Sequence, residues 1–202
     1  GVAGVVRTVL WGRRGLDFFS RVCALFKGGA IPVLVDPGIG LKHLKACLGN
    51  AEPEAFIGVP KAHAARVILG WGRGSVRATV TAGRRLLWGG PTLAQVERRG
   101  ASAPSRGFAP TSVDDVAAVV FTSGSTGPPK GVIYRHGNFI AQVNGIRDAY
   151  GIEPGEVNLP TFPLFALFDP ALGMTTVVPE MDPTHPAKVD PRKIVDPIKE
   201  YD

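Results

Sequence analysis

The stretch FTSGSTGPPKGV, residues 121–132, is the most informative part of this sequence for fold and function. Gly124 and Gly127 allow backbone conformations closed to other residues and let the main chain approach a ligand closely. Successive backbone N–H groups in such a loop form a concavity that binds anions. Four hydroxyl side chains and one lysine add further groups that can bind an anion. The stretch therefore predicts a polyphosphate-binding loop made of Thr122, Ser123, Gly124, Ser125, Thr126, Gly127 and Lys130.

Two better-known phosphate loops do not match this stretch. Gly131 follows Lys130 at the place where G-x-x-x-x-G-K-[ST] requires a hydroxyl residue, and the chain contains no G-x-G-x-x-G. A cluster of Ser, Gly, Thr and Pro is often a plain linker. Here, however, β-type runs at 116–121 and 131–135 bracket the cluster, which favours a loop held between two strands.

Upstream of the loop, strand and helix patterns alternate. Apolar runs at 5–11, 31–35, 55–59 and 76–81 are typical of strands, and helical periodicity marks 16–27, 41–48 and 61–69. Gly28 and Gly29 are expected to end the first helix. Repeated strand–helix–strand order predicts an α/β fold with a mostly parallel sheet, right-handed crossovers and flanking helices.

A change of composition at residues 100–110, GASAPSRGFAP, indicates a linker. We therefore divide the chain into a first α/β part, 1–110, and a phosphate-loop part, 111–202. In the second part, Asn138 is expected to cap a helix that carries Phe139, Val143, Ile146 and Tyr150 on one face. The proline-containing tail, 180–202, shows no clear terminal element.

Composition narrows the possible functions. The net charge is +6, but the basic residues do not interleave with aromatic ones, so a nucleic-acid partner is not expected. The apolar runs are too short to cross a bilayer. Cys23 and Cys47 are predicted to be small buried hydrophobic residues, which suits a reducing, cytoplasmic compartment. The histidines His43, His63 and His185 are expected on surfaces, and no metal-ligand spacing is present.

The loop resembles the signature phosphate loop of the adenylate-forming superfamily, which includes acyl-CoA synthetases, peptide-synthetase adenylation domains and luciferases. The segments 135–139, RHGNF, and 16–37, LDFFSRVCALFKGGAIPVLVDP, resemble the same superfamily. A narrower resemblance comes from VLVDPGIGLKHLKACL, EAFIGVPKAHAAR and FPLFALFDPALGM. These are similar to the β-lactone synthetases of bacterial olefin biosynthesis and to fatty acyl-AMP and acyl-CoA ligases.

The resemblance implies an incomplete large N-terminal domain of an enzyme that uses ATP and Mg to activate a fatty or β-hydroxy fatty acid as an acyl-adenylate. In this family Lys130 would act in catalysis by offsetting phosphate charge. The second step would be thioester formation with coenzyme A, or displacement of AMP by the substrate's own β-hydroxyl. Phe165, Ala166 and Phe168 match the family's acyl-pocket segment, and the alternative is that these aromatics are ordinary core.

Later motifs of the superfamily are missing, including Tyr-Gly-x-Thr-Glu and the lysine of the C-terminal domain. We therefore expect that this stretch alone does not adenylate a substrate. Two alternatives stay open. One is a non-catalytic nucleotide-binding or interaction module derived from the family, and the other is an unrelated phosphotransferase using the same loop.

Overall fold

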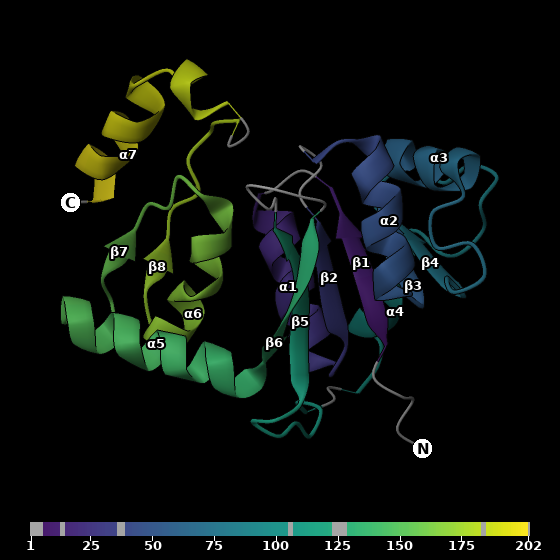
Figure 1. The fold of residues 1–202 in the computed structure, drawn as a ribbon. Coiled ribbons are helices and arrows are strands. Elements are labelled where there is room, and N and C mark those ends of the chain that lie inside the picture. The colour runs from purple at the N-terminus through teal and green to yellow at the C-terminus, as the bar shows by residue number, and fades with distance from the viewer. Residues whose placement is uncertain are drawn as a thin grey trace. The chain divides into compact units, whose positions relative to one another are not determined.

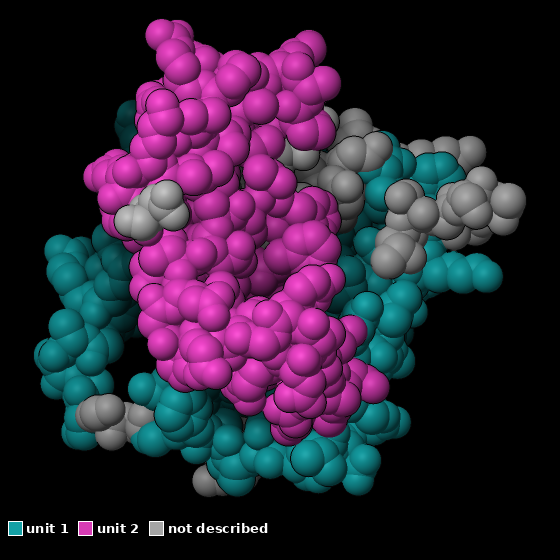
Figure 2. Space-filling model, turned by 90° about the vertical axis from the view of Figure 1, so that its left-hand side faces the viewer, with its two compact units in different colours: residues 1–13, 20–136 teal, residues 14–19, 137–202 magenta. Residues whose placement is uncertain are grey.

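A computed structural model describes residues 6–12, 15–35, 39–104, 107–122, 129–182 and 185–201. The chain forms two compact units (Figure 2): Gly1–Arg13 with Ser20–His136, called unit 1, and Arg14–Phe19 with Gly137–Asp202, called unit 2. These compact units divide after His136. The division predicted between residues 110 and 111 separates two parts of one large enzyme domain, and it stays a prediction. None of the described helices is both long and apolar enough to span a bilayer.

Unit 1 is built on a six-stranded sheet (Figure 1). Its strands lie in the order β4-β3-β1-β2-β5-β6, and all pairs are parallel except the antiparallel β5–β6 pair. The predicted α/β class with a mostly parallel sheet is therefore confirmed. The strands are β1 (Arg7–Trp11), β2 (Ile31–Val35), β3 (Ala55–Gly58), β4 (Ala78–Thr81), β5 (Val116–Thr122) and β6 (Lys130–Arg135).

The helices between these strands are α1 (Leu16–Lys27), α2 (Leu41–Ala51), α3 (Pro60–Leu69) and α4 (Leu93–Ala101). Because β2 and β3 flank β1 on opposite sides, right-handed crossovers place α1 and α2 on opposite faces of the sheet. All five residues of β2 are buried, as expected for a strand covered on both faces. The core beneath α2 includes Val9, Val33, Leu44, Leu48 and Phe56.

Glycine and a capping box set two helix boundaries. α1 ends at Lys27, and Gly29 follows with a φ of 71°, which confirms the predicted glycine stop. α4 was not expected from the sequence and reaches into the predicted linker. Thr92 begins it, since its hydroxyl accepts from the N–H of Gln95 while the Gln95 side chain accepts from the N–H of Thr92.

Unit 2 begins along α5 (His136–Tyr150), and a two-stranded parallel sheet joins β7 (Val157–Asn158) to β8 (Thr175–Thr176). Its other elements are η2 (Pro163–Leu167), α6 (Asp169–Leu172), η3 (Pro186–Lys188) and α7 (Arg192–Tyr201). Two predictions are wrong here. α5 starts at His136, so Asn138 lies inside the helix rather than capping it, and the tail does form a terminal helix, α7.

His63 contradicts the prediction of a surface histidine. It is fully buried on α3, with its ring centroid 5.1 Å from that of Phe56 and stacked on Trp88 at 5.3 Å. Nε2 donates to the carbonyl oxygen of Val80 at 3.0 Å, so the proton of the neutral ring sits on Nε2. Burial lowers the pKa of His63 below its usual value. His43 and His185 are exposed, as predicted.

The cysteines and tryptophans show how unit 1 is packed. Cys47 is buried as predicted, whereas Cys23 is exposed, which corrects the expectation for that residue. Trp71 is almost fully buried, and its ring lies 5.7 Å from that of Trp11. Trp88 donates its Nε1 hydrogen to the hydroxyl of Thr81 at 2.8 Å. All three tryptophans of the chain therefore belong to unit 1.

Candidate functional site

The strand ends of unit 1 set the position of the candidate site. Val35 pairs with Phe121 across the parallel β2–β5 pair, so both strands end at the same level. The chain then returns as β6, with Lys130 opposite Thr122 in the antiparallel register. Ligands of open α/β sheets bind outside the carboxyl ends of the strands. The structure thus brings Thr122 and Lys130 together at the expected edge.

Most of the predicted phosphate loop falls between these two residues. Ser123, Gly124, Ser125, Thr126 and Gly127 lie outside the described residues, and for Thr122 only the backbone is described. Their assignment to phosphate binding therefore stays a prediction. Their two neighbours in the chain, the end of β5 and the start of β6, are fixed by the sheet.

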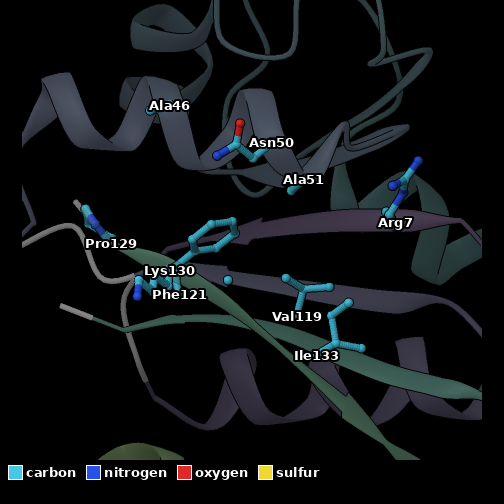
Figure 3. A pocket seen from close by; sticks show the side chains of 10 residues that line it. Arg7, Ala46, Asn50, Ala51, Val119, Phe121, Pro129, Lys130 and Ile133 are labelled. Atoms are coloured by element: carbon cyan, nitrogen blue, oxygen red, sulfur yellow. The ribbon is translucent and has the colours of Figure 1, made fainter. Parts of the chain in front are cut away.

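A pocket of about 520 Å³, which we call the Lys130 pocket, extends from Lys130 along the sheet of unit 1 as far as Arg7 (Figure 3). Strands β5 and β6 supply most of one wall and helix α2 the other. Figure 3 shows the ring of Phe121 between Lys130 at one end and Arg7 at the other. The lining residues are Arg7, Ala46, Asn50, Ala51, Val119, Phe121, Pro129, Lys130, Gly131 and Ile133.

Charge in the Lys130 pocket is positive. Among the described residues that line it none is acidic, and Lys130 is exposed without an ion pair to any described residue. Arg7 is the second cation, but its guanidinium lies 3.7 Å from the carboxylate of Glu52, which offsets part of its charge. The end of the pocket at Lys130 is therefore the end that favours an anion.

Gly131 has a packing role that motif reading missed. A Cβ added there would lie 3.1 Å from both Cε1 and Cζ of Phe121, closer than ordinary contacts. The Phe121 side chain is 5% exposed and belongs to the main core cluster. The glycine after Lys130 therefore leaves room for the Phe121 ring to pack closely against the start of β6, next to the pocket.

The predicted acyl-pocket residues lie in unit 2 on and after η2. Ala166 is 4% exposed, whereas Phe165 is 61% exposed. The two rings contact different partners: Phe165 lies 5.3 Å from Phe162, and Phe168 lies 6.2 Å from Phe139, centroid to centroid. The two rings thus pack against different aromatic partners, and their role in acyl binding, like that of Ala166, stays a prediction.

Asp169 fixes this segment and was not anticipated from the sequence. Its carboxylate is 1% exposed and accepts hydrogen bonds from the Asn158 amide at 2.9 Å and the Thr176 hydroxyl at 2.6 Å. One acidic side chain thus joins the start of α6 to both strands of the small sheet. Arg7 and Asn50 were also missed, since neither belongs to a recognisable motif.

Comparison with known proteins relates this chain to one enzyme family. The chain is 55% identical over 201 residues to olefin beta-lactone synthetases of Xanthomonas campestris and Stenotrophomonas maltophilia. The match covers all of this chain and 36% of each relative, so the chain spans about a third of their length. A proline–[prolyl-carrier protein] ligase of Pseudomonas fluorescens is 29% identical over 160 residues, covering 77% of this chain and 30% of that protein.

Solved structures show the same fold. A long-chain fatty-acid CoA ligase from Rhodopseudomonas palustris superposes with a TM-score of 0.72 at 17% identity, over 97% of this chain and 48% of its own. ATP-bound MatB from the same organism gives 0.72 at 20% identity, over 98% and 38%. The family model described as AMP-binding enzyme matches residues 1–190. The superfamily predicted from residues 121–132 is thus confirmed, and the chain belongs to the AMP-binding enzyme family.

Proposed function

We propose that the full-length protein is an AMP-forming enzyme that activates a fatty or β-hydroxy fatty acid, with ATP and Mg as cofactors. The observation that carries this proposal is the position of Lys130. It is an exposed lysine without an ion pair to any described residue, at one end of a pocket whose described lining holds no acidic residue, and it follows Gly127 of the predicted glycine and hydroxyl stretch by three residues. Membership of the AMP-binding enzyme family supports the same reaction class.

Lys130 and the predicted loop before it suit a nucleoside triphosphate. Lys130 would offset the charge of the phosphates, and the backbone of 122–127 would donate hydrogen bonds to them. Bound Mg·ATP would supply the electrophilic phosphate that the carboxylate of the substrate attacks. Because positioning and charge neutralisation dominate phosphoryl chemistry, the role of this part of the protein is to hold and orient the phosphates.

The substrate and the second step are proposed from the relatives. Two olefin beta-lactone synthetases share 55% identity with this chain, which favours a β-hydroxy acid whose own hydroxyl displaces AMP. Transfer to coenzyme A is the alternative second step. Ala166, a buried residue in the segment that carries Phe165 and Phe168, is proposed to line the site of the acyl chain.

The experiment measures products and rates with the full-length protein. Incubation with ATP and β-hydroxy fatty acids should release AMP and pyrophosphate, and a β-lactone should form without coenzyme A. Lys130→Ala should lower kcat/KM for ATP about 100-fold, the usual cost of removing one group that stabilises transition-state charge. Lys61→Ala is the matched control, since Lys61 is an exposed lysine on α3 outside the pocket.

Three results would contradict the proposal. Release of ADP would indicate a phosphotransferase. Nucleotide binding without turnover of any acid would indicate a non-catalytic module. Equal kcat/KM for Lys130→Ala and Lys61→Ala would show that Lys130 does not contact the phosphates.

A further inference from the structure

The positive charge of the chain is concentrated in one segment of unit 1. Residues 60–101 contain eight basic residues and one acidic residue, Glu97, and so carry a formal charge of +7. The remaining fifteen basic and sixteen acidic residues of the chain give −1, so this segment accounts for the whole net charge of +6. The eight are Lys61, Arg66, Arg73, Arg77, Arg84, Arg85, Arg98 and Arg99.

A second pocket, which we call the β4 pocket, lies within this segment. Its volume is about 490 Å³, and it shares no lining residue with the Lys130 pocket. Arg66 from α3 and Arg77 from the residue before β4 line it together with the apolar side chains of Val80, Trp88 and Pro91. Among the described residues that line it, none is acidic.

The aromatic wall of the β4 pocket is held rigidly. Trp88 stacks on the buried ring of His63 with an interplanar angle of 9°, and its Nε1 hydrogen is donated to Thr81, which is also fully buried. Arg85 donates to the carbonyl oxygen of Gly90 at 2.7 Å and so fixes the loop after Trp88. A flat apolar surface is therefore in place before any ligand binds, which lowers the entropic cost of binding.

The two arginines of the pocket lack counter-ions. Neither Arg66 nor Arg77 forms an ion pair within the described part of the chain, and the Nε atom of Arg66 is buried without a hydrogen-bond partner there. Burial lowers the pKa of Arg66. Its guanidinium lies 5.8 Å from the centroid of Phe56, and this cation–π contact offers only partial compensation. A partly buried guanidinium whose Nε lacks a partner is stabilised when an anion binds beside it.

We propose that the β4 pocket binds a phosphate monoester. Arg66 and Arg77 hold the phosphate, because guanidinium groups match its geometry. The organic part of the ester lies on Trp88, Val80 and Pro91, since the pocket is too large for phosphate alone. This site is separate from the proposed nucleotide site at Lys130. A soluble ester and a phospholipid headgroup share this chemistry, and the experiment distinguishes them.

Phenyl phosphate is the probe, because it joins a phosphate to a flat apolar group. Isothermal titration of the full-length Lys130→Ala protein should show one phenyl phosphate site. Adding Arg66→Gln and Arg77→Gln to that protein should weaken binding at least about tenfold, because two charge-assisted hydrogen-bonding groups are lost. Adding Arg73→Gln should leave binding unchanged, since Arg73 is exposed and does not line the pocket.

Because Arg66 also packs on Phe56, Arg77→Gln alone is the variant that tests the site without risk to the fold. Vesicles of phosphatidic acid in phosphatidylcholine identify the source. If the protein sediments with these vesicles and the Arg77→Gln variant does not, the site binds a lipid headgroup. If the protein binds phenyl phosphate but does not sediment with the vesicles, the site binds a soluble ester. Phenyl phosphate binding that is absent, or that Arg77→Gln does not weaken, overturns the proposal.

Discussion

Replacing Gly131 with alanine tests the packing beneath the Lys130 pocket. The added Cβ would lie 3.1 Å from two ring atoms of Phe121, whereas carbon atoms in ordinary contact are about 3.5–4.0 Å apart. The ring must therefore shift by a few tenths of an ångström against the core residues that it contacts. Such overpacking costs about 1–3 kcal/mol, and removing glycine from a strand returns about 0.5–1 kcal/mol. We expect a net loss of about 1 kcal/mol.

A double-mutant cycle isolates this contact. Phe121→Leu removes both ring atoms that the new Cβ meets, so Gly131→Ala should be neutral or stabilising in that background. The coupling free energy, measured by urea unfolding of the four proteins, should be about 1–2 kcal/mol. Gly49→Ala in α2 is the control, since nothing lies within 4 Å of its Cβ position. It should be neutral or gain up to about 1 kcal/mol. Additivity within about 0.5 kcal/mol would refute the predicted clash.

Three further predictions concern other residues. Burial lowers the pKa of His63 in the folded state below the value of about 6.5 that it has when unfolded, so the stability that neutral His63 contributes is complete above about pH 6.5 and is lost, by at most about 1.4 kcal/mol per pH unit, as the pH falls toward the folded pKa. His63→Gln should flatten the acid limb of a stability–pH profile, and an unchanged limb would contradict this. Ala166→Trp in the full-length enzyme should exclude long acids and retain short ones, because the indole would fill the space of the acyl chain. The loss of binding should grow with chain length, since each buried methylene contributes about 0.8 kcal/mol. An unchanged dependence of activity on acyl-chain length would indicate that Ala166 is a core residue and does not line the acyl site. Asp169→Leu leaves the amide of Asn158 and the hydroxyl of Thr176 unpaired, so urea unfolding should show a loss of about 2–4 kcal/mol. Asp169→Asn has the same shape and keeps one acceptor oxygen, so it should cost less, and equal losses for the two variants would contradict this account of the hydrogen bonds.

The parallel sheet of unit 1 could be predicted because its signals are local. β2 matches its apolar run, and α1 ends where two glycines follow. α4 was not predicted because its apolar pattern is limited to Leu93 and Val96, and none of its residues is buried. Its one local signal was the capping box of Thr92 and Gln95, which a search for capping pairs could have found.

The site was predictable only where it forms a motif. Lys130 was identified from its neighbours in the sequence, whereas Arg7 and Asn50 reach the same pocket only through the tertiary fold, from β1 and α2. His63 was misjudged for a related reason. Its burial depends on Trp88, which lies in a loop beyond the next strand, and no pattern within α3 reports that contact.

The placement of the tryptophans makes the two units optically distinct. All three indoles of the chain belong to unit 1, so emission excited selectively at tryptophan reports that unit alone. Far-ultraviolet dichroism also reports α5 and α7, most of whose residues belong to unit 2. Comparing the two signals during denaturation of this chain therefore distinguishes a single cooperative transition from stepwise melting. An indole introduced at Phe162 would give unit 2 an emission signal of its own.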